Sequence, residues 1–269
     1  MASGKIIGII SLKGGVGKTT AVANLGAILA QEFGKKVLLV DANFGAPNLG
    51  LHVGLIDPKT TLHHVLNDRA DVGDAIYPHG AGFHVIPASF IERKVNPFRL
   101  KQKIGHLKNS YDLILVDSSP NLNDEVLATM IASDELLVVT TPDYPTLSTT
   151  LRAVKLAKQK RTPITGLILN KVRNKGFELS LEEIEDAAGV PVLSVLPDDI
   201  NVLEALSATT PVALHKGMSN ASIELKKLAA SLVGESFEDP RWWKRVQGML
   251  GKGYGKDQVN RELLKNDRI

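Results

Sequence analysis

A glycine-rich segment near the amino terminus constrains the fold more than any other feature of this chain. Residues 11–20 have the sequence Ser-Leu-Lys-Gly-Gly-Val-Gly-Lys-Thr-Thr, directly after the first apolar run and directly before a stretch with helical spacing. A loop in this place turns successive backbone N–H groups inward at the positive end of a helix dipole, where a phosphate group binds. Glycine is needed because a side chain would block the close approach of the backbone to phosphate. The segment therefore predicts a strand–loop–helix unit that binds the phosphates of a nucleotide.

The residues of this loop have separate expected roles. Lys18 is expected to reach the β- and γ-phosphates, and the hydroxyl of Thr19 is expected to ligate Mg²⁺. Further contacts to the nucleotide are expected from Gly14, Gly15, Val16, Gly17 and Thr20. Leu12 stands where the usual pattern has a glycine, and Lys13 is an additional cation. A glycine-rich turn without a ligand is the alternative, and the Gly-Lys-Thr triplet in this context argues against it.

The rest of the chain alternates between strand and helix patterns. Its short runs rich in Val, Ile and Leu do not alternate polar with apolar residues, which is typical of strands buried on both faces of a parallel sheet. The expected strands are Lys5–Ser11, Lys36–Val40, Phe83–Ile86, Leu113–Val116, Glu135–Thr140, Ile164–Leu169 and Val192–Val195. The expected helices are Thr19–Glu32, Thr146–Lys160, Leu179–Ala188 and Ser219–Val233. This alternation predicts a doubly wound α/β domain with a mostly parallel sheet and helices on both faces.

Three of these runs are followed by polar residues that suit a nucleotide site. Parallel strands bring their carboxyl ends to one edge of the sheet, where a nucleotide triphosphatase needs carboxylates for metal and water. We expect Asp117 to ligate Mg²⁺, directly or through water, and Asp41 to serve the same site. The third run ends at Asn170 and Lys171, where an amide can read the edge of a nucleobase. The alternative for each is a residue that merely begins a loop or turn.

Composition narrows the classes of function. The 269 residues include no cysteine, which excludes disulfides, thiol nucleophiles and iron–sulfur ligation by thiolate. The formal net charge of +3 is too small to indicate a nucleic-acid binder. No apolar run approaches the roughly 18–20 residues that span a bilayer, and the first residues lack the layout of a signal peptide. We therefore expect a cytoplasmic protein whose membrane contact is peripheral, at the inner face of the cell membrane.

The loop and several later segments resemble the deviant Walker A ATPases of the MinD/ParA group. The loop has the Lys-Gly-Gly-x-Gly-Lys-Thr form of that group, and the resemblance covers residues 4–233. It is carried further by residues 40–51, 61–66, 85–88, 117–120 and 196–198. The resemblance is closer to MinD than to ParA, chiefly through residues 48–51 and the run from Pro197 to Pro211.

This resemblance implies an ATP- and Mg²⁺-dependent homodimer whose two nucleotides face each other across the interface. Lys13 would cross to the partner's phosphates, where a second cation neutralises charge that develops in phosphoryl transfer. The family's asparagine at the Asn170 position and the segment around Pro197 and Asp198 would bind adenine. A further protein, still unidentified, would stimulate hydrolysis or be the cargo.

One departure from the family concerns the chemistry directly. Family members carry a second aspartate two residues after the first, and this chain has Asn43 there. Asparagine can position the attacking water but cannot accept a proton. Because positioning outweighs proton abstraction in phosphoryl transfer, Lys13, Lys18, Asp41 and Asn43 remain the expected catalytic set. We expect ATP hydrolysis that is slow or depends on a partner.

The composition changes near residue 234, which predicts an ATPase domain at 1–234 and a tail at 235–269. On a helix, Trp242, Val246, Met249 and Leu250 would share one face, with Trp243 beside it. Five cations, including Arg241, and no acid occur from Pro240 to Lys256. Tryptophan and cations together favour an anionic membrane surface. The alternatives are docking on the chain's own domain and docking on a partner protein.

The sequence thus predicts a MinD-like ATPase that acts as a membrane-associated spatial regulator, in division-site or polar positioning. A ParA-like partition ATPase, whose ATP dimer binds DNA without sequence preference, is the alternative. The candidate DNA-binding residues are Arg152, Lys155, Lys158, Lys160 and Arg161. The small net charge favours the first prediction over DNA binding. Redox carriers built on the same loop need cysteines that this chain lacks.

Overall fold

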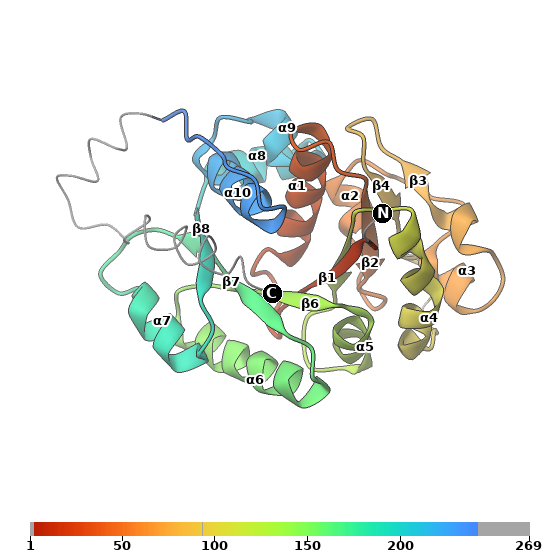
Figure 1. Ribbon diagram of the computed structural model, residues 1–269, viewed down its shortest axis with the longest axis horizontal. Helices are drawn as coiled ribbons and strands as arrows, with labels where there is room; N and C mark the ends of the chain where they lie inside the picture. The colour runs from red at the N-terminus through yellow and green to blue at the C-terminus, as the bar shows by residue number, and fades with distance from the viewer. Residues whose placement is uncertain (1–2, 93, 242–269) are drawn as a thin grey trace.

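The computed structural model describes residues 3–92 and 94–241. At its centre is one eight-stranded sheet with the order β3-β4-β2-β5-β1-β6-β7-β8 (Figure 1). The strands are β1 Lys5–Ile10, β2 Val37–Ala42, β3 Tyr77–Pro78, β4 His84–Ile86, β5 Leu113–Ser118, β6 Glu135–Thr140, β7 Ile164–Val172 and β8 Val192–Pro197. The edge strand β3 is antiparallel to β4, and the other pairs are parallel.

Helices cover both faces of this sheet. The α-helices are α1 Lys18–Gln31, α2 Leu49–His52, α3 Leu62–Leu66, α4 Leu100–Ile104, α5 Asp124–Ala132, α6 Tyr144–Lys160, α7 Leu181–Ala188, α8 Ile200–Ser207, α9 Val212–His215 and α10 Asn220–Leu232. Short 3₁₀ helices occur at Val72–Ala75, Pro97–Arg99 and Gly105–Asn109. Figure 1 shows α1, α8, α9 and α10 on one side of the sheet and α5, α6 and α7 on the other. The predicted fold class is therefore confirmed.

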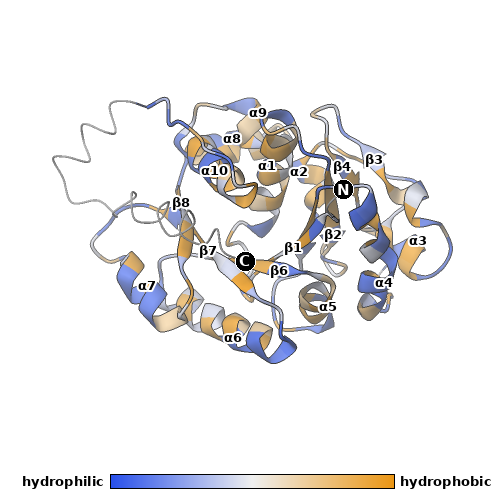
Figure 2. Ribbon diagram, in the orientation of Figure 1, coloured by the Kyte–Doolittle hydropathy of each residue, from blue (hydrophilic) through white to orange (hydrophobic). Residues whose placement is uncertain are grey.

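The strands do not alternate polar with apolar residues because both faces of the sheet are buried. Every residue of β2 and β5 is buried, and α1 packs on the sheet through an almost wholly apolar face (Figure 2). Gly26 brings α1 close to β2, since a Cβ there would lie 2.6 Å from a methyl carbon of Leu39. This close packing sets the position of the amino terminus of α1, and with it the phosphate loop.

The structure differs from the sequence predictions at several element ends. Asp41 and Asp117 lie inside β2 and β5 instead of just after them. The two-residue strand β3 and the helices α2, α3, α4, α5, α8 and α9 were not predicted. The start of α5 has a signal of its own, because the side chain of Asn123 caps it by accepting a hydrogen bond from Val126 N.

The beginning of the predicted tail packs on the domain. The chain continues from α10 to Arg241, whose side chain is only 2% exposed. The prediction of Arg241 as a cation of the tail's basic surface is wrong, because its guanidinium pairs with Glu224 and Asp239. Trp242 and the rest of the predicted membrane segment lie outside the described residues. No helix in residues 3–92 and 94–241 has the length and apolar character needed to cross a membrane.

Candidate nucleotide-binding site

The phosphate loop connects β1 to α1 and leaves the first turn of that helix open to an anion. Gly17 is the N-cap of α1, with φ 101°, and no side chain caps the helix. The first turn of α1 contains no acidic residue. Its unpaired backbone N–H groups and the helix dipole therefore favour phosphate at this end.

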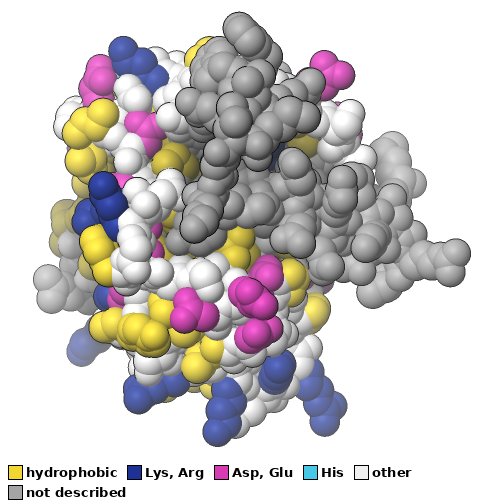
Figure 3. All heavy atoms as spheres, turned by 90° about the vertical axis from the view of Figure 1, so that its left-hand side faces the viewer, with side chains coloured by type: hydrophobic (Ala, Val, Ile, Leu, Met, Phe, Trp, Pro, Cys, Tyr) yellow, Lys and Arg dark blue, Asp and Glu magenta, His cyan; other side chains and the backbone are white. Residues whose placement is uncertain are grey.

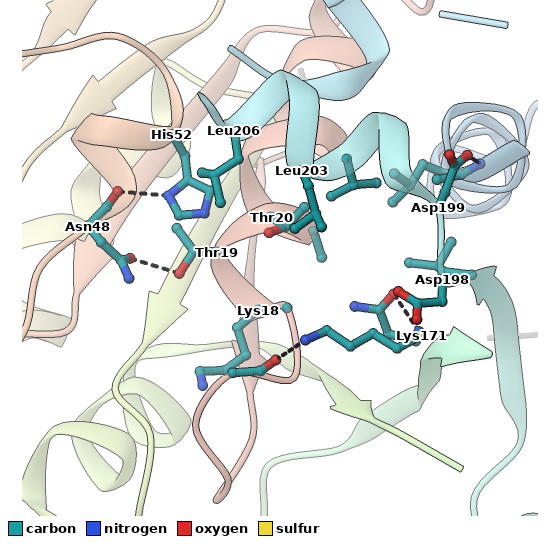
Figure 4. A pocket seen from close by; sticks show the side chains of 18 of the residues that line it. Lys18, Thr19, Thr20, Asn48, His52, Lys171, Asp198, Asp199, Leu203 and Leu206 are labelled. Atoms are coloured by element: carbon teal, nitrogen blue, oxygen red, sulfur yellow. Dashed lines mark hydrogen bonds between the residues drawn. The ribbon is translucent and has the colours of Figure 1, made fainter. Parts of the chain in front are cut away.

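Asn170 and Lys171, at the end of β7, support this loop from the side. The amide of Asn170 donates to Val16 O at 2.7 Å. Lys171, shown in Figure 4, donates from its Nζ to Gly15 O at 2.7 Å. A Cβ on Gly17 would lie 2.2 Å from Asn170 Nδ2, so a glycine is required for this contact. Both residues support the loop here. The contact of Asn170 with adenine and the contact of Lys171 with the nucleotide stay predictions.

A cavity of about 290 Å³ opens beside the loop. Of the residues predicted from the sequence, the cavity is lined by Gly14, Gly15, Gly17, Lys18, Thr19, Thr20, Asn43, Asn170, Lys171, Pro197 and Asp198. The side chain of Val16 instead packs in the core, leaving only its backbone for a ligand. The structure thus brings together residues from four separate parts of the sequence, 14–20, 43, 170–171 and 197–198.

Sequence reasoning missed one wall of this cavity. Asn48 and His52 line it from the region of α2, Leu203 and Leu206 from α8, and Leu225 from α10. Figure 4 shows Leu203 and Leu206 on the side of the cavity where Thr20 lies. The available signal was the spacing of Leu203 and Leu206, two leucines three residues apart just after the Pro197-Asp198 motif.

The two predicted carboxylates lie side by side on neighbouring strands. Asp41 pairs in register with Asp117, and both side chains are buried. Burial raises the pKa of Asp117, while the neighbouring Thr19 hydroxyl and Lys18 ammonium oppose this. Burial also raises the pKa of Asp41, and the charge of Asp117 raises it further. Two carboxylates in this environment favour a bound cation.

The environment of Asp117 fits Mg²⁺. Neither of its carboxylate oxygens has a hydrogen-bond partner among the described residues, although both are buried. The hydroxyl of Thr19 donates to Asn48 Oδ1 at 2.9 Å. The same hydroxyl lowers the pKa of Asp117, against the effect of burial. Carboxylate and hydroxyl oxygens are the ligands that Mg²⁺ prefers, so Thr19 and Asp117 would bind it.

Asp41 has a different set of contacts. Its oxygens accept hydrogen bonds from the backbone N–H groups of Asn43, Asn48 and Leu49, at 3.0–3.1 Å. These bonds fix the segment between β2 and α2, including Asn43, whose amide donates to Ala46 O at 2.5 Å. The structure therefore shows Asp41 as an anchor of this segment, and its predicted metal and catalytic roles stay predictions.

The two lysines of the loop point to different places. Lys18 lines the cavity, and burial lowers its pKa while the charge of Asp117 opposes the shift. Lys13 does not line this cavity; its Nζ lies 3.2 Å from Asp143 Oδ1 and 2.5 Å from Thr146 Oγ1, at the first turn of α6. Asp143 also caps α6 by accepting from Thr146 N. Lys13 is thus directed away from the nucleotide site of its own chain.

Comparison with known proteins identifies the family. Residues 4–164 match a family model described as an AAA domain, and residues 99–233 match one described as an NUBPL iron-transfer P-loop NTPase. The septum site-determining protein MinD of Thermotoga maritima is 31% identical over 243 residues, covering 86% of this chain and 89% of that protein. The chain belongs to the MinD/ParA family of P-loop NTPases.

Other members of this family are similar to the chain over almost the whole domain. An uncharacterised ATP-binding protein of Methanocaldococcus jannaschii is 36% identical over 235 residues, 86% of this chain and 89% of that protein. The crystal structure of the cell division ATPase MinD of Pyrococcus furiosus superposes with a TM-score of 0.82 at 34% identity, over 86% of this chain and 99% of that one. MinD of Pyrococcus horikoshii, complexed with Mg-ADP, superposes with a TM-score of 0.81 at 34% identity, over 85% and 95%. The predicted resemblance to the MinD/ParA group is confirmed.

Proposed function

We propose that this chain is an ATPase that dimerises when it binds Mg-ATP. The dimer would act at a membrane as a spatial regulator, in division-site or polar positioning, in the manner of MinD. Its cofactors, ATP and Mg²⁺, are those of its family. The loop N–H groups and Lys18 would bind the phosphates, and Thr19 and Asp117 would ligate Mg²⁺. When bound, the ion neutralises charge on the phosphate oxygens and orients the transferred group.

One observation carries the proposal of a dimer. Lys18 lines the cavity, whereas Lys13 lies outside it and points to Asp143 on the outside of the domain. This pair is weak, because both side chains are about 40% exposed and surface ion pairs contribute roughly 0–1 kcal/mol. Lys13 can therefore leave Asp143 at little cost and reach the phosphates of a second chain.

Slow hydrolysis follows from the residue at position 43. Asn43 lines the cavity and is held by its bond to Ala46 O, so it can orient a water but has no basic group. Where a general base accepts a proton in the transition state, its loss slows the reaction by about 10²–10⁴-fold. We infer an ATP dimer that persists until a partner protein stimulates hydrolysis.

Membrane binding is proposed for the segment that contains Trp242, Trp243, Val246, Met249 and Leu250. One short amphipathic segment binds a bilayer weakly, and a dimer that presents two segments gains avidity. Nucleotide-dependent dimerisation would then control membrane attachment.

Sedimentation with anionic vesicles tests this function. We expect the wild type to pellet with vesicles in Mg-ATP and to remain in the supernatant in Mg-ADP. Lys13→Ala should bind ATP and fail to pellet. Equal pelleting of the wild type with both nucleotides, or no pelleting with either, would refute the membrane part of the proposal.

The exposed side of α6 supports DNA binding as a second candidate. Its residues Arg152, Lys155, Lys158 and Lys160, with Arg161 after them, are exposed, and none forms an ion pair within the described chain. Lys and Arg side chains gather along the lower edge of Figure 3, on the side of the molecule where α6 lies. DNA retention by the ATP-bound protein that falls steeply with salt, and is lost in Lys155→Glu, would favour this candidate.

A further inference from the structure

The cavity beside the phosphate loop has two polar ends. Thr19 and Asn48 lie at one end, where Mg²⁺ would bind, and Asp198 lies on the opposite side, as does Lys171 (Figure 4). Leu203 and other apolar side chains form part of the wall, which suits a flat base. A nucleotide whose phosphates bind at the loop would therefore extend its base away from Thr19, toward Asp198.

Asp198 is the carboxylate of this cavity that a base can meet. In the described part of the chain, two acidic residues line the cavity, Asp198 and Asp199. Both oxygens of Asp199 are occupied, Oδ1 by the N–H of Asn201 and Oδ2 by the N–H of Ala221. Asp198 instead pairs with a cation, because its Oδ2 accepts a hydrogen bond from Arg173 Nε at 2.7 Å.

The strands place Arg173 beside Asp198. β7 and β8 are parallel with Val172 opposite Pro197, so the residues that follow these two lie side by side. The backbone N–H of Asp198 donates to Val172 O at 3.0 Å. The backbone N–H of Arg173 donates to both carboxylate oxygens of Glu178, at 2.9 and 3.2 Å. The backbone thus holds both partners of the ion pair in place.

The two purine bases differ in the hydrogen-bonding groups on their edges. Guanine presents two donors side by side, N1–H and the N2 amino group, whereas adenine presents the acceptor N1 beside its N6 amino group. A carboxylate accepts two hydrogen bonds at once and therefore fits guanine. A guanidinium has donors only, so it opposes the two donors of guanine and is compatible with N1 of adenine.

From this geometry we propose that Arg173 makes the site selective for adenine over guanine nucleotides. Arg173 occupies Asp198 Oδ2 and neutralises the carboxylate, which would otherwise bind the two donors of guanine. Its guanidinium also brings N–H donors to the place where guanine needs acceptors. Arg173 is thus a positioning residue that acts through Asp198. The inference rests on the proposed nucleotide site and is independent of dimerisation and of membrane binding.

Exposure to solvent limits the size of this effect. The side chains of Arg173 and Asp198 are 60% and 39% exposed. A well-aligned bidentate contact between a side chain and a base discriminates by about 5- to 150-fold. Because charged contacts near solvent are weakened, we expect a value toward the lower end, about 10-fold.

Calorimetry of the full chain with Mg-ADP and with Mg-GDP measures the selectivity. The diphosphates are suitable probes because they leave no phosphate to hydrolyse and, under the proposed function, do not drive dimerisation. We expect Arg173→Ala to bind Mg-GDP about 10-fold more tightly than the wild type does, and to bind Mg-ADP within about threefold of the wild type. Unchanged affinity for Mg-GDP would overturn the proposal, as would equal weakening of both nucleotides, which indicates a merely structural role.

Three further variants assign the effect to the ion pair. Arg173→Lys keeps the positive charge and should keep the selectivity, and Lys175→Ala, at an exposed cation two residues away, should change neither affinity. Adding Asp198→Asn to Arg173→Ala should abolish the gain for Mg-GDP, because an amide cannot accept two hydrogen bonds side by side. A gain that persists in this double variant, or that also occurs in Lys175→Ala, would overturn the proposal. A wild type that binds neither diphosphate would refute the nucleotide site itself, and the inference with it.

Discussion

The phosphate loop offers a prediction whose magnitude can be worked out from two glycines. Gly15 and Gly17 both have positive φ, 74° and 101°, so alanine at either position adds roughly 1–2 kcal/mol of backbone strain. The two sites differ in their surroundings. A Cβ at position 15 meets nothing within 4 Å, whereas a Cβ at position 17 would lie 2.2 Å from Asn170 Nδ2.

The amide of Asn170 is the end of a movable side chain, so it would rotate away and lose its bond to Val16 O. That bond contributes about 1 kcal/mol. We therefore expect Gly15→Ala to lower the free energy of unfolding by about 1–2 kcal/mol and Gly17→Ala by about 2–3 kcal/mol. Gly17→Ala should also weaken ATP binding more, because the loop loses its support from β7.

Urea unfolding of the nucleotide-free protein measures these differences, and a double-mutant cycle isolates the contact. Asn170→Ala should cost about 1 kcal/mol in the wild type and close to nothing in Gly17→Ala. Equal losses for Gly15→Ala and Gly17→Ala, or fully additive effects of Gly17→Ala and Asn170→Ala, would refute the reasoning.

Three other predictions concern the chemistry and the anchor of the chain end. Asn43→Asp restores a group that can accept a proton, so its rate of ATP turnover should exceed that of the wild type by about 10-fold or more in a phosphate-release assay; equal rates would show that position 43 does not limit hydrolysis. Asp117→Asn removes the negative charge and one of the two oxygens assigned to Mg²⁺, so ATP binding measured by calorimetry should lose its sensitivity to EDTA, and undiminished sensitivity would place the metal elsewhere. Burial alone would raise the pKa of Asp239, but hydrogen bonds from Arg241 and Lys227 hold it below its ordinary value of 3.8 in the folded chain, so its stabilising effect is complete above that value and is lost as the pH falls below it. Asp239→Asn should therefore lower the melting temperature at pH 7 and lower it less near pH 3, whereas the same loss at both values would exclude an ionic cause.

The sequence was sufficient to predict the parts of the fold and site that depend on local pattern. Strands buried on both faces are recognised by their continuous apolar composition. The loop from Gly14 to Thr20 follows such a strand and contains the glycines and the lysine that bind phosphate. Asp41 and Asp117 were predictable as neighbours because parallel strands align their carboxyl ends.

Features that depend on tertiary contact could not be predicted from the sequence. Asn170 and Lys171 support the loop through hydrogen bonds from β7 to residues more than 150 positions earlier in the sequence. The wall formed by α8 is apolar yet exposed, which no periodicity distinguishes from a core helix. Arg241 lies in a run of cations and is buried, because acidic partners on and after α10 reach it from outside the run.

Molar mass by light scattering tests the central claim, that Lys13 completes the nucleotide site of a second chain. We predict that the wild type is a dimer in Mg-ATP and a monomer in Mg-ADP, and that Lys13→Ala binds ATP but remains a monomer in both. A wild type that is monomeric in Mg-ATP, or a Lys13→Ala variant that dimerises as readily as the wild type, would contradict the account.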